Sequence, residues 1–464
     1  MVNLQKSMAL TILFFLIYIV VVVIIGIVSS RKETEEDFMI ANRKVSGVQV
    51  AATMSAGFFD GAVLSIYLAY IYQYGMSAAW MFVGLAIGFI LLRKRYALII
   101  KRKADEVQAY TMPEYFFKIF GKHNGLMFSF LLVFQYFLLM IVNFIIAGKV
   151  LSIIFPLPYY FSVIIGGVVI LSYLLLAGFK AVIKTDFFQL VIMFVMSLTV
   201  AIFLFGKTSI PVSEFNPITL GFGNLIGFLL LGSIGILVAP DLWQRIFATK
   251  DEANLKRGLG YSAIILPLLA IIISIVGLAT KQFFPNILPE DALITGFSKL
   301  LPFGLKEFGM VLLYAVALSS SDTITFMISS IFTRDLKNYT KKYSEESMKK
   351  LTRFFMLLFV VVTVIIAIAY QNIIALGLSM GSLSLALFPA ILGSFYWKLN
   401  ERAVFWSLVL SFVSVIIIFI ADKVTPENAV ISLPVALIAL VVLQKIFNRK
   451  KLTVVPNQFE KGSV

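Results

Sequence analysis

Runs of about twenty uncharged apolar residues recur from one end of the chain to the other, and they constrain its fold more than any other feature. Each run is long enough to cross the roughly 30 Å hydrocarbon core of a bilayer as an α-helix. Only 14% of the 464 residues are charged, whereas soluble domains carry charge on about a quarter of their residues. We therefore expect an all-α polytopic membrane protein in which no stretch forms a separate soluble domain.

Thirteen candidate spans account for these runs. The first run is too long for a signal peptide, and no small-residue cleavage site follows it, so we keep it as a helix. The expected spans cover roughly residues 8–28, 47–71, 77–99, 124–153, 158–177, 184–206, 223–247, 258–283, 303–334, 350–370, 373–397, 402–422 and 428–447.

Most of the basic residues fall in every second loop between these spans. If the N-terminus is placed outside, the loops of one side and the C-terminal tail hold 32 of the 39 Lys and Arg, and the other side holds the remaining 7. The positive-inside rule then predicts an outside N-terminus and a cytoplasmic C-terminus in the cell membrane. This placement also explains the net charge of +15 without a nucleic-acid partner.

The residues needed for intramembrane catalysis are scarce. The chain has no cysteine, no HExxH pattern and one histidine, His123, which falls in a predicted cytoplasmic loop. We therefore predict that the protein is not an enzyme. The nearby segment 101–120 mixes charged and aromatic residues, and it fits either an amphipathic stretch at the cytoplasmic surface or a solvated loop.

Two spans contain paired glycines at their middle. Span 47–71 carries Gly57 and Gly61 around Asp60, and span 223–247 carries Gly232 and Gly235. An overlay of the two halves, shifted by about 176 residues, brings the pairs together, as in transporters built from inverted repeats with broken helices at the site. Unwound backbone would leave carbonyls for a cation and half-helix N-termini for an anionic group. Close helix packing through glycine is the alternative.

Two carboxylates are expected deep in the bilayer. Asp60 and Asp322 lie near the middle of their spans, where each costs about 2.5–3.5 kcal/mol on insertion scales. A bound cation would offset this cost, and protonation or backbone donors would do so as well. In the run 319–323, Ser319, Asp322 and Thr323 share one helix face and Ser320 points about 100° away, so the helix can present two oxygen clusters.

Several segments resemble the sodium:solute symporter family, which includes bacterial proline, pantothenate, sugar and sialic acid carriers. The resemblance covers nearly the whole chain, and it implies a LeuT-like core of ten helices, here spans two to eleven, flanked by additional helices. The segments are YAVALSSSDTITFMISSIFTRDL (314–336), AGFKAVIKTDFFQ (177–189), MSAGFFDG (54–61), APDLWQR (239–245) and Phe388-Pro389 with Gly393 and Trp397.

The resemblance also implies where sodium ions bind. The shared sodium site would take the carbonyls of Phe58, Gly61 and Val316 and the hydroxyls of Ser319 and Ser320, with Asp60 beside it. A second cation site of some members would fall on Asp186, Ser319, Asp322 and Thr323. Asp186 lies only about two residues into its span, shortly after Lys180 and Lys184, so an interfacial ion pair is the alternative there. Two close carboxylates would need a cation or a shared proton, so proton coupling stays open.

The solute positions depart from those of proline carriers. A tyrosine and a tryptophan of those carriers correspond to Met140 and Gly232, so the same pocket is not expected. Asn143, Trp80 and Gln135 are candidates for lining a pocket or for packing between helices. Arg245 is a candidate for a cytoplasmic gate contact or for a topological anchor. We assign substrate or coupling roles to Gly57, Asp60, Gly232, Gly235, Met140 and Asn143.

These observations predict a Na⁺-coupled symporter that imports a small organic solute, with an amino acid or small carboxylate favoured. A proton-coupled symporter is the alternative, and a channel or a solute sensor is less favoured. We expect the lipid bilayer and the solute as partners, with no obligatory protein partner. The predicted divisions are 1–46 (an extra helix and loop), 47–206 and 207–397 (the two repeats), 398–447 (two further helices) and 448–464 (the tail).

Overall fold

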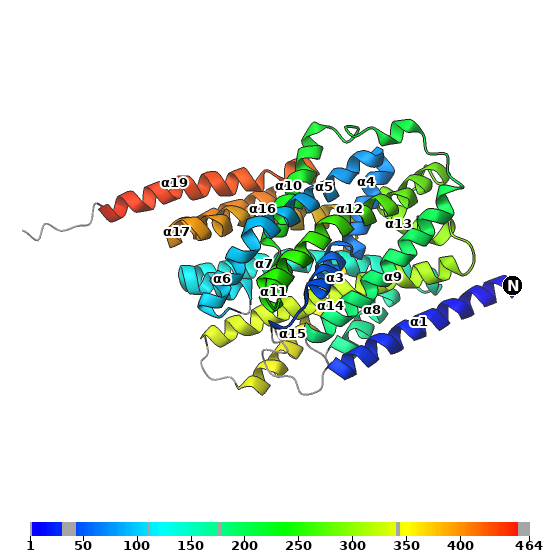
Figure 1. Ribbon diagram of the computed structural model, residues 1–464, viewed down its shortest axis with the longest axis horizontal. Helices are drawn as coiled ribbons and strands as arrows, with labels where there is room; N and C mark the ends of the chain where they lie inside the picture. The colour runs from blue at the N-terminus through cyan, green and yellow to red at the C-terminus, as the bar shows by residue number, and fades with distance from the viewer. Residues whose placement is uncertain (1, 30–42, 110, 175–178, 340–343, 453–464) are drawn as a thin grey trace, which may run out of the picture.

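The computed structural model describes residues 2–29, 43–109, 111–174, 179–339 and 344–452. These residues form helices joined by short loops, and their only β-type pairing is an isolated bridge between Val45 and Thr249. The helices lie side by side in one bundle, with α1 along one edge and α19 extending from the opposite corner (Figure 1). The all-α prediction is confirmed.

The first half of the chain begins with one flanking helix and then enters the bundle. Its helices are α1 (Val2–Ser29), α3 (Gly47–Phe58), α4 (Gly61–Tyr74), α5 (Trp80–Leu91), α6 (Ala97–Val107), α7 (Met112–Ile154), α8 (Tyr159–Leu174) and α9 (Phe179–Phe205).

The second half repeats the pattern of a divided helix followed by long ones. Its helices are α10 (Phe222–Val238), α11 (Pro240–Ala248), α12 (Glu252–Phe283), α13 (Ala292–Lys299), α14 (Leu305–Tyr339), α15 (Glu345–Ala369), α16 (Ile373–Tyr396), α17 (Glu401–Ile420), α18 (Pro426–Ala429) and α19 (Ser432–Leu452).

Contacts between helices define two groups. In one group α12 packs against α3 and α5, and α5 packs against α10; in the other α7, α8, α14 and α15 pack against one another. Most of the membrane-crossing part of α14 and of α7 is buried inside the molecule, whereas very little of α1 is. The site described below lies where the two groups meet.

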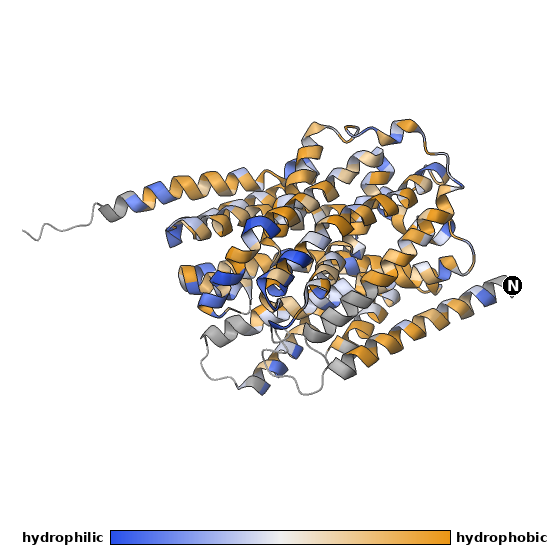
Figure 2. Cartoon of the chain, in the orientation of Figure 1, coloured by the Kyte–Doolittle hydropathy of each residue, from blue (hydrophilic) through white to orange (hydrophobic). Residues whose placement is uncertain are grey.

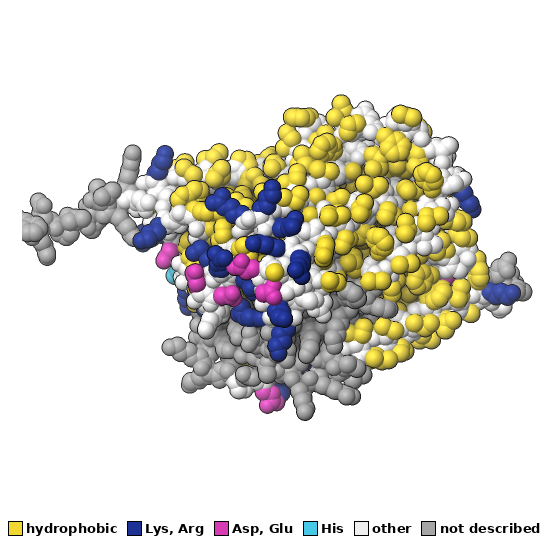
Figure 3. Space-filling model, in the orientation of Figure 1, with side chains coloured by type: hydrophobic (Ala, Val, Ile, Leu, Met, Phe, Trp, Pro, Cys, Tyr) yellow, Lys and Arg dark blue, Asp and Glu magenta, His cyan; other side chains and the backbone are white. Residues whose placement is uncertain are grey.

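The outer helices present apolar side chains to the outside. Ile202, Phe205 and Ile264 are each more than 60% exposed, as expected where lipid replaces water. Hydrophobic residues predominate on most helices in Figure 2, and hydrophobic side chains spread over the upper and right-hand parts of the face in Figure 3. Nine of the described helices are long and apolar enough to span a bilayer, or ten if one bent pair counts as a span, so thirteen spans remain a prediction.

Charged side chains gather at one end of the molecule. Figure 3 shows Lys and Arg interspersed with Asp and Glu there. Arg43 pairs with Asp105 at 2.5 Å, and Arg102 pairs with Glu252 at 2.8 Å, so three loops assigned to one side of the membrane meet in space. Of segment 101–120, the described residues are helical on both sides of a short turn near Gln108.

The second helix break lies later in the chain than expected. Gly232 and Gly235 are inside the continuous helix α10, and the break comes at Ala239, where α10 and α11 meet at 45°. Pro240 and Asp241 open α11, and a proline is well suited to the first position of a helix because it lacks an N–H. The first break, between Phe58 and Gly61, lies where it was predicted.

Candidate functional site

The break between α3 and α4 is held open by two side chains. Asp60 caps α4, with its Oδ1 accepting from the Val63 N–H at 2.6 Å. Asn143 on α7 accepts from the Ala62 N–H at 3.1 Å through Oδ1 and donates from Nδ2 to Asp60 Oδ2 at 3.3 Å. Both Asp60 and Asn143 are almost fully buried. One short polar cluster therefore fixes the start of α4.

These bonds free a backbone carbonyl at the end of α3. In an unbroken helix the carbonyl of Phe58 would accept from the N–H four residues later, at Ala62. That N–H donates to Asn143 instead. The Phe58 carbonyl is thus left without its helical donor, beside a carboxylate whose hydrogen-bond partners are all neutral. Such a pair of oxygens suits a small hard cation.

The break packs directly against the serine-rich part of α14. A side-chain carbon at Gly61 would lie 2.9 Å from Ala317 Cβ and 3.1 Å from Asn143 Oδ1, so this position admits only a hydrogen atom. On α14, Val316 directly precedes Ala317, and Ser320 lies about one helical turn after it. The structure therefore brings together the two segments in which the family resemblance implies one sodium site.

A polar cavity of about 50 Å³ opens at this junction. The Ser320 hydroxyl faces the Asp60 carboxylate across it. The polar or break-forming residues in its lining are Gly57, Phe58, Asp60, Tyr136, Asp241, Arg245, Ser320 and Thr323.

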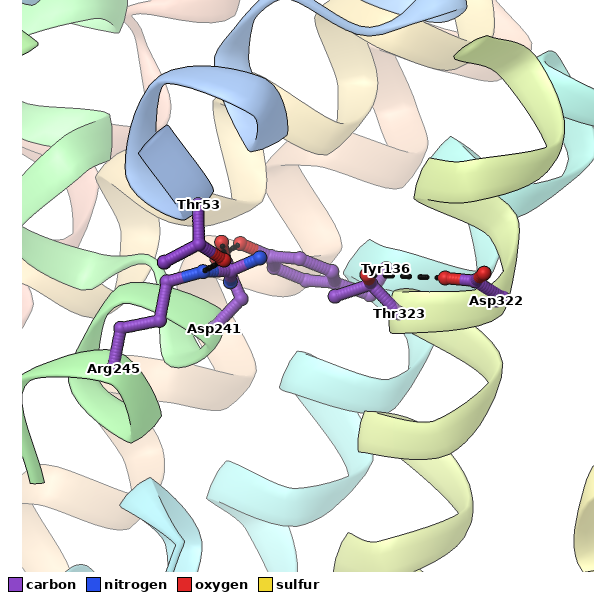
Figure 4. A network of polar contacts seen from close by, with 6 residues as sticks. All are labelled: Thr53, Tyr136, Asp241, Arg245, Asp322 and Thr323. Carbon is purple, nitrogen blue, oxygen red and sulfur yellow. Dashed lines mark hydrogen bonds and ion pairs between the residues drawn. The ribbon is translucent and has the colours of Figure 1, made fainter. Parts of the chain in front are cut away.

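The other predicted cation ligands lie beside or outside this cavity. Asp322 is buried and accepts from Thr323 Oγ1 at 3.3 Å, and in Figure 4 it points away from the Arg245 side of the cavity. Ser319 is buried on α14 but does not line the cavity. The side chain of Asp186 lies outside the described residues. The second cation site therefore stays a prediction.

Three residues of the cavity lining form a buried charged cluster together with Thr53. We call this cluster the Arg245 network: Thr53, Tyr136, Asp241 and Arg245. Arg245 pairs with Asp241 at 2.9 Å and donates from Nε to Thr53 Oγ1 at 2.8 Å, and the Tyr136 hydroxyl donates to Asp241 (Figure 4). Arg245 is only 1% exposed. The guanidinium is therefore buried between α3 and its own helix α11, and the choice between a gate contact and a topological anchor stays a prediction.

A larger, mostly apolar cavity of about 110 Å³ adjoins the polar one. Helices α4, α5, α7, α10 and α16 line this apolar cavity, and Phe58 and Tyr136 line both. Gly232 and Gly235 lie in its wall: Gly232 lets α10 approach α5, and Gly235 leaves open space toward Ser384. Gln135 is the amide in its lining.

The remaining candidates lie elsewhere. Met140 is fully buried and is absent from both cavity linings, and its sulfur lies 3.5 Å from Thr325 Oγ1 on α14. Trp80 donates to the Pro217 carbonyl at 2.9 Å, outside both cavities. Asn143 contacts the break, as described above. Of the three pocket candidates, only Gln135 belongs to the lining of the apolar cavity.

Sequence reasoning missed three members of the Arg245 network. Thr53, Tyr136 and Asp241 come from segments far apart in the chain, and a lone threonine or tyrosine in an apolar span carries no distinctive signal. Asp241 could have been found, because an Asp four residues before an Arg in a membrane helix is expected to form an i,i+4 ion pair.

Comparisons with known proteins place this arrangement among transporters. The family model described as "Sodium:solute symporter family" matches residues 38–411. The chain is 26% identical over 422 residues to the osmoregulated proline transporter OpuE of Bacillus subtilis, covering 84% of this chain and 85% of that protein. It is 25% identical over 422 residues to the sodium/pantothenate symporter of Haemophilus influenzae, covering 83% of this chain and 86% of that protein.

Solved structures share the fold. A Na⁺-coupled sialic acid symporter in a substrate-bound outward-open state superposes with a TM-score of 0.80 at 18% identity, covering 94% of this chain and 98% of that one. MhsT in complex with L-phenylalanine superposes with a TM-score of 0.55 at 14% identity, covering 86% of this chain and 97% of that one.

Proposed function

Because this chain belongs to the sodium:solute symporter family, a family of Na⁺-coupled membrane transporters with the LeuT-like fold, we propose that it imports an amino acid or a small carboxylate together with Na⁺ across the cell membrane. The N-terminus would lie outside and the C-terminus in the cytoplasm. The observation that carries this proposal is the contact of the Phe58–Gly61 break with α14 at Ala317, beside the Asp60 carboxylate.

The residues proposed for the shared site offer only oxygen atoms, which hard cations prefer. We assign the shared site to the carbonyls of Phe58, Gly61 and Val316 and to the hydroxyls of Ser319 and Ser320. The freed Phe58 carbonyl and the Ser320 hydroxyl at the polar cavity support this assignment. Asp60 would neutralise the ion, since its hydrogen-bond partners are all neutral donors and a buried uncompensated carboxylate is unfavourable.

A second cation site at Asp186, Ser319, Asp322 and Thr323 is part of the proposal. The buried contact between Asp322 and Thr323 supports it. If Asp322 carries a proton instead of facing a cation, transport would respond to a pH gradient. That outcome would favour the proton-coupled alternative.

Alternating access would follow from the two groups of helices. The group of α3, α5, α10 and α12 would rock against the group of α7, α8, α14 and α15. The Arg245 network ties α3 and α11 to α7, since Tyr136 is on α7 and Asp241 is on α11. Opening toward the cytoplasm would break the bond between Tyr136 and Asp241, so this network would act as the inner gate.

Uptake into proteoliposomes tests the proposed function. A radiolabelled mixture of amino acids should accumulate when an inward Na⁺ gradient is imposed, and the same mixture should stimulate the entry of radioactive sodium. Ser319→Ala and Ser320→Ala should each reduce this accumulation more than they reduce protein abundance. Accumulation that ignores the Na⁺ gradient but follows an inward proton gradient would replace sodium with protons in the proposal.

A further inference from the structure

Gln135, in the lining of the apolar cavity, has a buried side-chain oxygen without a hydrogen-bond partner. Gln135 is fully buried, and its Nε2 donates to Ser384 Oγ at 2.8 Å. Ser384 in turn donates to the Met380 carbonyl at 3.4 Å, so its hydroxyl accepts from the amide and the Gln135 oxygen is directed elsewhere. Gln135 Oε1 has no hydrogen-bond partner. An unsatisfied buried acceptor costs about 1–3 kcal/mol, which a ligand donor would recover.

The size of the space limits the solute. The apolar cavity and the adjoining polar cavity measure about 110 Å³ and about 50 Å³. A cavity of roughly 150 Å³ in another protein holds benzene, so a solute of about six to nine non-hydrogen atoms fits here. Glycines at 232, 235, 377 and 381 line this space, and side-chain carbons at Gly232, Gly377 and Gly381 would each clash with a neighbouring helix.

The charges around the space favour a solute without net charge. The charged side chains in the described linings are Asp60, Asp241 and Arg245, which sum to one negative charge that a single Na⁺ would balance. An anionic solute would need a further cation to avoid an uncompensated buried charge, and a cation at the proposed second site would already face the carboxylates of Asp186 and Asp322. The positive N-terminal ends of α4 and α11 would stabilise an anionic solute only weakly, because the carboxylates of Asp60 and Asp241 already lie there.

We propose that the solute is a compact molecule of zero net charge with an apolar body, and that Gln135 Oε1 accepts a hydrogen bond from an N–H or O–H group of it. Ser384 holds the amide in this orientation. The inference rests on the proposed symport function, and it narrows the solute to the class of small neutral amino acids and related amides. Simple carboxylate anions are thereby excluded.

An isomer pair tests the donor requirement. L-valine and glycine betaine have the same atoms and the same net charge, but glycine betaine has no N–H group. Thermal stabilisation of the purified full chain in Na⁺ would be titrated with L-valine, L-alanine, L-proline and 3-methylbutanamide, and with glycine betaine, 3-methylbutanoate and pantothenate. We expect at least one member of the first set to bind ten or more times tighter than every member of the second.

Two variants test whether the Gln135 amide causes the preference for solutes with an N–H group. Gln135→Met keeps the side-chain length and should weaken the preferred solute about tenfold, while glycine betaine changes little, so the preference collapses. Ser384→Ala frees the amide to rotate and should reduce the same ratio in part. Gln282→Leu makes a similar exchange at an exposed position outside both cavities and should leave the ratio unchanged.

Several results would overturn this inference. The first is tighter binding of glycine betaine, 3-methylbutanoate or pantothenate by the wild type. The second is an unchanged ratio of the affinities for the preferred solute and glycine betaine in Gln135→Met. The third is no response to any member of the first set in protein that Na⁺ stabilises. Stabilisation by Na⁺ alone is the separate readout for the proposed function. If Na⁺ gives no stabilisation, the proposed function fails and the solute inference fails with it.

Discussion

The two divided helices of this protein use the same device for different purposes. In each, a carboxylate lies at the start of the second half: Asp60 caps α4, and Asp241 is the second residue of α11. Asp60 has only neutral hydrogen-bond donors around it, whereas Asp241 is paired with the buried Arg245. The first break is therefore left with a charge for a cation to balance, and the second is balanced by the protein itself.

This difference suits the first break to binding a cation and the second break to holding helices together. A buried carboxylate among neutral donors gains from a cation that arrives and leaves, which is what a coupling ion does. A buried carboxylate joined to a guanidinium and a tyrosine hydroxyl holds helices together until the whole cluster opens. In the proposed function, sodium binds at the break between α3 and α4 and α11 carries the inner gate, and the substitutions below test this difference.

The largest effect is expected when the balanced charge is broken. Asp241→Asn would leave the Arg245 guanidinium buried without a counter-charge, which costs about 3–5 kcal/mol. Protein abundance and the thermal midpoint in detergent should both fall sharply. Glu346→Gln is the matched control, because Glu346 forms an exposed i,i+4 pair with Lys350, and this variant should behave as the wild type. A normal midpoint for Asp241→Asn would remove the distinction between the two breaks.

Removal of the other carboxylate should have the opposite effect on stability. Asp60→Asn removes a buried negative charge that no protein cation balances, so the midpoint without Na⁺ should not fall. The sodium concentration needed for half-maximal stabilisation should rise at least tenfold, about 1.4 kcal/mol. Asp422→Asn, at an exposed position, provides the control. Unchanged sodium stabilisation in Asp60→Asn would argue against a cation beside this carboxylate.

A smaller effect is expected at the residue that holds the first break open. Asn143→Leu removes the acceptor of the Ala62 N–H and a donor to Asp60, so that N–H can return to the Phe58 carbonyl. Half-maximal stabilisation should then require about fivefold more sodium, the effect of one net hydrogen bond of about 1 kcal/mol. Sodium titrations that match those of the wild type would mean that Asn143 has no part in the site.

The smallest effect is expected at a glycine first assigned to the second break. Gly235→Ala adds a methyl group that meets only Ser384 Cβ at 4.0 Å, inside a continuous helix. Stability should stay level or rise by up to about 1 kcal/mol, and sodium stabilisation should not change. Gly61→Ala should lower sodium affinity, because its methyl group would clash with Ala317. Equal responses of the two variants would contradict the assignment.

The first break was predictable from sequence and the second was only partly so. Asp60 between Gly57 and Gly61 is a charge in an apolar span, and its capping role follows from its position. Gly232 and Gly235 suggested a break, but a glycine pair serves close packing equally well, and Gly232 packs against α5. Pro240 followed by Asp241 was the better signal for the start of a helix.

The helical fold followed from the length and spacing of the apolar runs, and the meeting of 58–61 with 316–320 followed from the resemblance to the family. The contacts of Asn143, Gln135 and Tyr136 could not be predicted in the same way. All three lie on α7, and which of them faces the break, the apolar cavity or the gate depends on how helices distant in sequence pack around it. Only the three-dimensional arrangement settles this.

Equilibrium binding of radioactive sodium to the purified protein tests the central claim most directly. The wild type should bind sodium saturably, and excess unlabelled NaCl should displace it. Ser320→Ala and Asp60→Asn should lose most of this binding while they remain folded, as judged by elution as a single symmetric peak. Sodium binding of wild-type strength in both variants would contradict the assignment of the ion to the junction of the first break with α14.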